Sequence, residues 1–140
     1  MDRKANAHWQ GDLKTGKGTV SSGSGTLSST PYSFRDRFED GTSTNPEELL
    51  AAAHAACFTM ALSMVLQGEG LKADALDTQC TITFEKLPDG FTITHSKLEL
   101  TGTVPGATAE VFEKAAQTAK ANCPVSRLYK TEISLTAKLA

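Results

Sequence analysis

The chain has few cysteines, few aromatic residues and no excess of charge of either sign, and these shortages exclude several classes of protein. Its 140 residues include three cysteines, one tryptophan, and 14 basic against 16 acidic residues. An odd number of cysteines, with no CxxC unit and no His/Cys cluster at metal-ligand spacing, predicts neither a disulfide framework nor a metal site. The absence of a basic stripe argues against a nucleic-acid partner. We expect a single domain over residues 1–140.

Long apolar runs are scarce as well. The first four residues lead into polar sequence without an apolar leader region, so we expect no signal peptide and a cytoplasmic location. The longest apolar stretch, Leu49–Leu66, is interrupted by His54, Thr59 and Ser63, which favours a buried helix over a membrane span. A hydrophobic fraction of 39% and a charged fraction of 21% are ordinary for a soluble globular chain.

Hydrophobic periodicity predicts an α+β fold. No internal repeat is present. In chain order we expect a strand over 5–10, a Ser/Gly-rich loop over 21–29, a strand over 32–38, a helix over 46–67, paired strands over 76–84 and 91–103, a helix over 108–121 with Val111, Ala115 and Ala119 on one stripe, a short helix ending at Tyr129, and a strand over 133–139.

The helix that begins at Pro46 is the most sharply specified element. Asn45 is a good N-cap, Pro46 suits the first helical position, and Glu48 completes a pattern like a capping box. Gly68 and Gly70 end the helix. Its faces are nearly all apolar, including those that one small sheet cannot cover. We therefore expect a homodimer that shares its core across this helix.

Cys57 and Cys123 are the two candidate reactive thiols. A peroxide-reducing enzyme needs one thiol that attacks the peroxide and another that closes a disulfide on it. Cys57 lies about eleven residues into the helix, where the helix dipole has faded, and packing as a small hydrophobe is an equal alternative. Cys123, before Pro124, either starts a short helix that favours its thiolate or is a surface cysteine at a turn. Cys80, in an alternating strand, is expected in the core.

A reactive Cys57 needs a nearby cation. His54 precedes it by one turn, although a lone histidine in an apolar run is more often just packed. Arg35 and Arg37, on the preceding strand, are better suited, because a guanidinium stays charged and its fork can hold a peroxide oxygen as well as a thiolate.

Glu47 and Glu48 lie in the first turn of the helix, where acidic residues stabilise the N-terminus, and one of them can also orient the arginine. Glu47 lies ten residues from Cys57, about 15 Å along a straight helix. A compact Glu–Arg–Cys site is therefore hard to form on one such helix. It can assemble if Glu47 and Arg37 of one subunit meet Cys57 of the other, and the dimer would then be a requirement for catalysis.

Two segments carry a resemblance to a known family. Thr-Asn-Pro-Glu-Glu-Leu at 44–49, followed by Ala-Ala-Ala-His-Ala-Ala-Cys-Phe at 51–58, resembles the osmotically inducible protein C (OsmC) family. Ala-Asn-Cys-Pro-Val-Ser at 121–126 is similar to that family's second cysteine segment. The resemblance covers essentially the whole chain. The sister group, the organic hydroperoxide resistance proteins, typically carries Gly-Tyr where this chain has Ala53-His54.

The resemblance implies an α+β OsmC-like fold in which antiparallel sheets wrap around long central helices in an intertwined homodimer, with active sites at the subunit interface. It implies a cytoplasmic, peroxiredoxin-like oxidoreductase of the osmotic and oxidative stress response. Cys57 matches the peroxidatic cysteine and Cys123 the resolving cysteine. Arg37 matches the arginine that activates the thiolate, with Arg35 left open as the alternative, and Glu47 matches the carboxylate that positions that arginine.

The implied cycle runs through a Cys57 sulfenic acid and a Cys57–Cys123 disulfide. An external dithiol, with dihydrolipoyl groups of lipoylated proteins as the expected source, restores both thiols, and no bound cofactor or metal is implied. Organic hydroperoxides are expected as substrates ahead of hydrogen peroxide; neither nucleic acid nor membrane is expected as a partner. Two alternatives stand beside this function: a non-enzymatic redox-sensing or structural dimer, and a family member that uses its thiols for another reaction on a small molecule.

Overall fold

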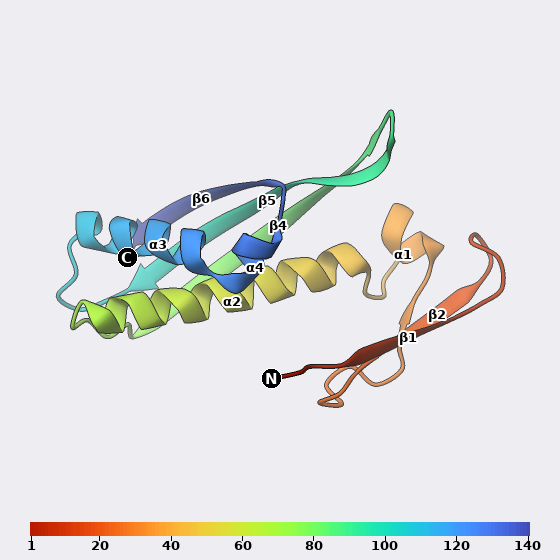
Figure 1. The fold of residues 1–140 in the computed structure, drawn as a ribbon, viewed down its shortest axis with the longest axis horizontal. Helices are drawn as coiled ribbons and strands as arrows, with labels where there is room; N and C mark the ends of the chain where they lie inside the picture. Colours follow the sequence, from red (N-terminus) through yellow and green to blue (C-terminus); the bar gives the residue numbers. More distant parts are fainter. The chain divides into compact units, whose positions relative to one another are not determined.

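The computed structural model describes residues 1–140 and divides them into two compact units, residues 1–49 and 50–140. Six strands and four helices make up the chain (Figure 1). A single domain over residues 1–140 remains a prediction. The elements are β1 (Ala5–Gln10), β2 (Lys17–Ser22), β3 (Thr30–Tyr32), α1 (Phe34–Phe38), α2 (Pro46–Gly68), β4 (Ala75–Leu87), β5 (Gly90–Thr103), α3 (Ala109–Asn122), α4 (Pro124–Leu128) and β6 (Glu132–Leu139).

The first unit contains an antiparallel sheet with the strand order β1-β2-β3. The strand expected over 5–10 is confirmed as β1, whereas β2 was not expected, because Val20 is its only apolar residue. Gly18 on β2 is required by packing: a Cβ there would lie 2.6 Å from the ring of Tyr32 and 2.7 Å from that of Trp9. The two rings contact each other across this glycine, with centroids 5.5 Å apart.

The strand expected over 32–38 is wrong. The chain leaves β3 at Tyr32 and forms the short helix α1, capped by Ser33, whose hydroxyl oxygen accepts the N–H of Asp36 at 3.4 Å. Phe34 and Phe38 satisfy the period of a strand and also the i, i+4 spacing of a helix. In the structure they pack with ring centroids 4.7 Å apart on one side of α1. The Ser33-x-x-Asp36 spacing, which is typical of a capped helix start, favours the helix over the strand here.

The second unit contains a sheet with the order β4-β5-β6. The expected hairpin is confirmed: β4 and β5 pair antiparallel from Ala75↔Thr103 to Leu87↔Gly90, with a register shift at Thr83/Phe84. Gly90 permits the tight turn, because its φ of 134° lies in a region that other residues rarely adopt. β6 then pairs parallel with residues 95–102 of β5, beside the half of the hairpin that lies away from its turn. The expectation of antiparallel sheets is therefore wrong for this last strand.

The core of the second unit lies between α2, α3 and the sheet. Residues 58, 62 and 66 of α2 form a buried stripe against residues 98 and 100 of β5. The α3 helix begins after its N-cap Thr108, as expected, but its buried face is Phe112, Ala115, Ala116 and Ala119. The prediction that Val111 belongs to the buried face is therefore wrong, because Val111 points outward and Phe112 fills the core. Ala115 and Ala119 lie on the buried face as predicted.

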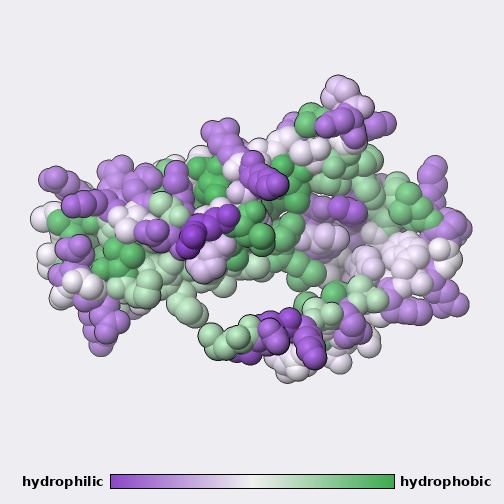
Figure 2. Space-filling model, in the orientation of Figure 1, coloured by the Kyte–Doolittle hydropathy of each residue, from purple (hydrophilic) through white to green (hydrophobic).

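The α2 helix begins and ends where the sequence predicts. The side-chain oxygen of Asn45 accepts the N–H of Glu48 at 2.8 Å, which is the expected cap. Only one stripe of α2 is buried, at residues 54, 58, 62 and 66. Met60 and Met64, elsewhere on α2, are 75% and 68% exposed. The surface along α2 is accordingly pale green in Figure 2, the colour of moderately apolar residues. By length and composition alone α2 would also suffice to cross a membrane, a test that core helices pass too.

Candidate active site

The two candidate thiols lie side by side in the second unit. The Cys57 Sγ on α2 and the Cys123 Sγ at the start of α4 are 2.9 Å apart, and both cysteines are free thiols. A disulfide bond is about 2.05 Å long, so closing it requires a shift of roughly one ångström at the sulfur atoms. Cys123 is completely buried, whereas Cys57 is partly exposed. Of the pair, only Cys57 can be reached from solvent.

The break between α3 and α4 directs Cys123 inward. The Cys123 N–H closes α3 on the carbonyl of Ala119 at 2.8 Å, and Pro124 then starts α4 at a position where its missing N–H costs nothing. Cys123 occupies the N-cap position, but its thiol makes no capping hydrogen bond. The thiol contacts Cys57 instead. The alternative of a surface cysteine at a turn is therefore wrong.

The surroundings of Cys57 within the second unit do not activate it. Burial raises the pKa of the Cys57 thiol, and the contact with the Cys123 thiol raises this pKa further. The backbone N–H of Val125, on α4, acts in the opposite direction but does not compensate. A reactive thiolate at Cys57 therefore requires positive charge from another source.

His54 does not supply that charge. It is completely buried, and each of its ring nitrogens contacts a serine hydroxyl: Nδ1 lies 2.7 Å from the Ser96 Oγ and Nε2 lies 2.8 Å from the Ser126 Oγ. Burial lowers the pKa of His54, which favours the neutral ring. Neither serine was singled out in the sequence. The sequence offers one indication that Ser126 matters, because this residue lies in the segment 121–126 that resembles the family's second cysteine segment.

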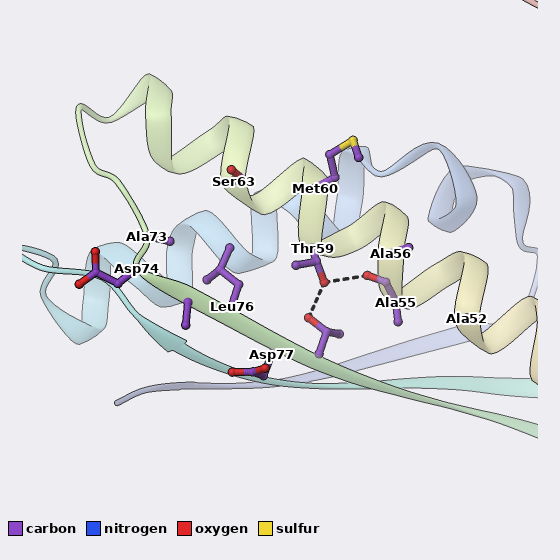
Figure 3. Close-up of a pocket in the computed structure, with 12 residues that line it drawn as sticks. Ala52, Ala55, Ala56, Thr59, Met60, Ser63, Ala73, Asp74, Leu76 and Asp77 are labelled. Atoms are coloured by element: carbon purple, nitrogen blue, oxygen red, sulfur yellow. Dashed lines mark hydrogen bonds between the residues drawn. The ribbon is translucent and has the colours of Figure 1, made fainter. Parts of the chain in front are cut away.

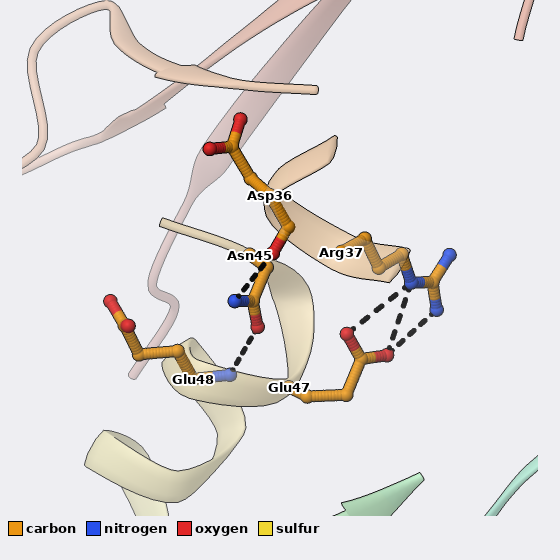
Figure 4. Close-up of polar contacts among 5 residues, drawn as sticks. All are labelled: Asp36, Arg37, Asn45, Glu47 and Glu48. Carbon is orange, nitrogen blue, oxygen red and sulfur yellow. Dashed lines mark hydrogen bonds and ion pairs between the residues drawn. The ribbon is translucent and has the colours of Figure 1, made fainter. Parts of the chain in front are cut away.

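Arg37 and Glu47 form a two-pronged ion pair in the first unit (Figure 4). The Arg37 Nη2 donates to the Glu47 Oε1 at 2.8 Å, and the Arg37 Nε donates to the same oxygen at 3.2 Å and to Oε2 at 3.3 Å. The guanidinium carbon also lies 5.5 Å from the centre of the Phe38 ring. Glu47 is only 11% exposed at its side chain, whereas Arg37 is 38% exposed and can still meet a ligand.

Arg35 is placed differently from Arg37. It pairs with Glu39 at 3.6 Å, and both side chains are largely exposed, at 70% and 55%. Residues two apart point in nearly opposite directions on a helix but in the same direction on a strand. Because α1 is helical, Arg37 and not Arg35 meets Glu47. That Arg37 is also the partner of the Cys57 thiolate stays a prediction.

Asp36 and Asn45 hold the segment that carries this ion pair. The Asn45 side-chain amide donates to the Asp36 carbonyl at 3.0 Å, and the Asp36 Oδ1 accepts the Ser43 N–H at 2.8 Å (Figure 4 shows the first contact). Hydrogen bonds from Ser33 and Ser43 lower the pKa of Asp36, which keeps it ionised. A Cβ at Gly41 would lie 2.3 Å from Asp36, so this loop requires glycine. The sequence alone did not single out Asp36.

The site places a pair of free thiols within bonding reach on an α+β fold, and the family to which the chain belongs includes proteins named for a redox role. No group of His, Cys, Asp and Glu side chains is arranged to hold a metal ion. The chain belongs to the OsmC family, since the family model described as OsmC-like protein matches residues 39–138. The resemblance inferred from residues 44–58 and 121–126 is thereby confirmed.

Known relatives agree with this membership. The chain is 49% identical over 139 residues to "Peroxiredoxin OsmC" of Escherichia coli K12, covering 99% of this chain and 97% of that protein. It is 33% identical over 101 residues to the "Organic hydroperoxide resistance protein" of Xanthomonas axonopodis pv. citri, covering 71% and 69%.

Solved structures confirm the α+β OsmC-like fold. The organic hydroperoxide resistance protein OhrB of Bacillus subtilis matches with a TM-score of 0.74 at 23% identity, over 98% of each chain. An OsmC-like protein of unknown function from Vibrio cholerae matches with a TM-score of 0.79 at 16% identity, over 98% of this chain and 99% of that one.

Proposed function

We propose that the chain is a two-cysteine hydroperoxide reductase, with Cys57 as the attacking thiol and Cys123 as the resolving thiol. The observation that carries the proposal is the 2.9 Å separation of the two sulfur atoms, one reachable from solvent and one buried. The printed names of the relatives, peroxiredoxin OsmC and organic hydroperoxide resistance protein, support the same chemistry and organic hydroperoxides as substrates. Hydrogen peroxide is expected to react less well.

The first step consumes the peroxide. The Cys57 thiolate attacks the distal oxygen of ROOH, an S–O bond forms as the O–O bond breaks, and the leaving alkoxide takes a proton to become the alcohol. Cys57 is left as a sulfenic acid. The Cys123 sulfur then attacks the Cys57 sulfur, so that an S–S bond forms and the hydroxyl group leaves as water. In total the two thiols give two electrons and two protons to the peroxide.

Burial of Cys123 constrains the return step. A reductant approaching from solvent meets the Cys57 sulfur first, so its thiolate forms a mixed disulfide with Cys57 and releases Cys123. A second thiol of the same reductant then releases Cys57 and leaves the reductant as a disulfide. This two-thiol requirement fits dihydrolipoyl groups, and lipoylated proteins are the partners that we propose.

A second copy of the chain supplies the activating charge in this proposal. Ten residues of α2, about 15 Å of helix, separate Glu47 from Cys57. We place Arg37 and Glu47 of one subunit against Cys57 of the other, so that the guanidinium stabilises the thiolate and holds the peroxide.

The unburied side of α2 supports a homodimer. Figure 3 shows a broad depression between α2 and β4, lined on α2 by small residues such as Ala55, Ala56 and Ser63, with Met60 at its rim. Its volume is about 730 Å³. Small side chains allow two helices to approach closely. The α2 helix of a second copy has an apolar surface of the same length, so we propose that the two α2 helices pack against each other. The solution mass from light scattering decides between a dimer and a monomer.

The function is tested by turnover of cumene hydroperoxide with dihydrolipoamide as the reductant. A reductase consumes many equivalents of hydroperoxide per chain and oxidises a matching amount of dithiol. A redox sensor or structural dimer consumes one equivalent and stops. Slow and incomplete oxidation of the Cys57 thiol by one equivalent of hydroperoxide would instead indicate a different thiol reaction.

Removing the charge of Arg37 is expected to lower the reaction rate of the Cys57 thiol about tenfold or more at neutral pH. Only the thiolate is nucleophilic, and the cation stabilises the thiolate relative to the thiol. Without it the pKa of Cys57 rises, so the reactive form appears only at higher pH. The rate of Cys57 alkylation by iodoacetamide, measured against pH in Arg37→Met, should keep its alkaline plateau while its midpoint moves upward. Arg35→Met serves as the matched control, and an equal shift in that variant would contradict the assignment.

A further inference from the structure

His54 links the Cys123 segment to α2 through a buried hydrogen-bonded chain. Its Nε2 contacts Ser126 on α4 at 2.8 Å and its Nδ1 contacts Ser96 on β5 at 2.7 Å. Both ring nitrogens are therefore occupied, and both His54 and Ser96 are completely buried. The neutral ring donates through one nitrogen and accepts through the other, and a serine hydroxyl can take either part.

This contact is one of several that join the same two segments, and these include an edge-to-face contact of the His54 and Tyr129 rings at 5.0 Å. Along α2, the residues Leu50, His54 and Cys57 are spaced by about one helical turn. Tyr129 donates its hydroxyl to the Leu50 carbonyl at 3.1 Å, Ser126 contacts His54, and Cys123 contacts Cys57 at 2.9 Å. Residues 123–129 thus run along residues 50–57 in the opposite direction. The serine contact is the middle one and lies directly beside the thiol pair.

Besides Ser126, the contacts of α4 are the Val125 backbone N–H, which hydrogen-bonds the Cys57 thiol, and the Val125 side chain. The helix has five residues, and Ser126 is the only buried one. Leu128, its last residue, is 74% exposed, and Val125 is only partly buried against the core. A helix this short has no stability of its own. Its position therefore depends on the contacts at its two ends, on the Val125 N–H and on the buried Ser126 hydroxyl between them.

We propose that His54 is a positioning residue for disulfide closure: by holding Ser126 it keeps the Cys123 sulfur within reach of the Cys57 sulfenic acid. This role rests on the proposed function, because it concerns the second step of that cycle. Ser96, on the middle strand of its sheet, is the fixed end of the chain, and α4 is the part that it holds. The attack on the peroxide uses the Cys57 thiolate and the Arg37 guanidinium, and it does not depend on His54.

The test separates the two steps in a single turnover. Wild type and Ser126→Ala are mixed with one equivalent of cumene hydroperoxide, and the samples are quenched over time with dimedone, which traps sulfenic acid. Loss of the Cys57 thiol should proceed at the same rate in both. Disulfide formation should be about tenfold slower in Ser126→Ala, the size expected for losing one buried hydrogen bond, and the dimedone adduct should accumulate.

Ser134→Ala is the matched control. It removes another histidine–serine contact of the same sheet, His95 Nε2 to Ser134 Oγ at 2.9 Å, which does not touch α2 or α4. Its rate of disulfide formation should equal that of wild type. Equal slowing in Ser126→Ala and Ser134→Ala would show a general loss of stability and overturn the proposal.

A double-variant cycle shows whether Ser126 acts through His54. In a His54→Gln background the further change Ser126→Ala should slow closure by less than twofold, because the contact is already lost. A full additional tenfold loss overturns the role of His54. If His54→Gln does not fold, Ser126→Thr decides, since it keeps the hydroxyl and should close at the wild-type rate. Failure of wild type to form any disulfide refutes the proposed function, whereas an unchanged rate in Ser126→Ala refutes only this inference.

Discussion

Cys57→Ser is expected to lose hydroperoxide turnover by about a thousandfold or more, which is the loss typical of removing an enzyme's nucleophile. A serine hydroxyl is not ionised at working pH and does not attack the O–O bond. Cys123→Ser should behave differently. It keeps the attacking thiol and loses only the partner 2.9 Å away, so one equivalent of hydroperoxide should convert it to a sulfenic acid that forms no disulfide.

The two variants are compared by counting hydroperoxide consumed per chain and by the mass of the intact protein. Cys123→Ser should gain one oxygen atom after one equivalent and further oxygens with excess peroxide. Cys80→Ser is the control, because Cys80 lies against Ser96 and not against the thiol pair. Turnover that persists in Cys57→Ser, or that disappears equally in Cys80→Ser, would contradict the assigned roles.

The elements whose signals are local were predictable from the sequence. The cap at Asn45 and the proline at the first helical position specified the start of α2, and Pro88-Asp89-Gly90 specified the turn between β4 and β5. These signals act within a few residues, so no tertiary contact overrides them. The segment 32–38 was not predictable from apolar spacing, because that spacing fits a strand and a helix equally well.

The thiol pair and its supports depend on tertiary structure. Cys57 and Cys123 lie 66 residues apart in sequence, and no pattern gives their distance in space. Family resemblance paired them, and the fold brings their sulfur atoms together. Ser96 and Ser126 carry no signal in their composition or spacing. Their importance follows from the burial of His54 between two elements, since a buried imidazole requires a partner at each nitrogen.

Mixing a slowed Arg37 variant with an inactive Cys57 variant is expected to restore activity if the site is shared between subunits. Arg37→Ala lacks the cation and Cys57→Ser lacks the thiol. In a mixed dimer, the Cys57 of the first chain can meet the Arg37 of the second, so one of its two sites is complete. Random assembly makes half of the dimers mixed, which predicts about a quarter of wild-type turnover for the total protein. Turnover is measured after the two chains are refolded together, with each chain alone as the baseline.

The alternative is that Arg37 activates the Cys57 of its own chain. Every subunit in the mixture would then lack either the arginine or the thiol of its site. Activity would then stay at the baseline of the separate variants. Refolding Cys57→Ser with the double variant Arg37→Ala/Cys57→Ser controls for effects of mixing, since no thiol is present for either geometry. The 38% exposure of the Arg37 side chain, held by Glu47, leaves the guanidinium able to meet a second subunit. The raised pKa of Cys57 within its own unit is the reason that it needs one.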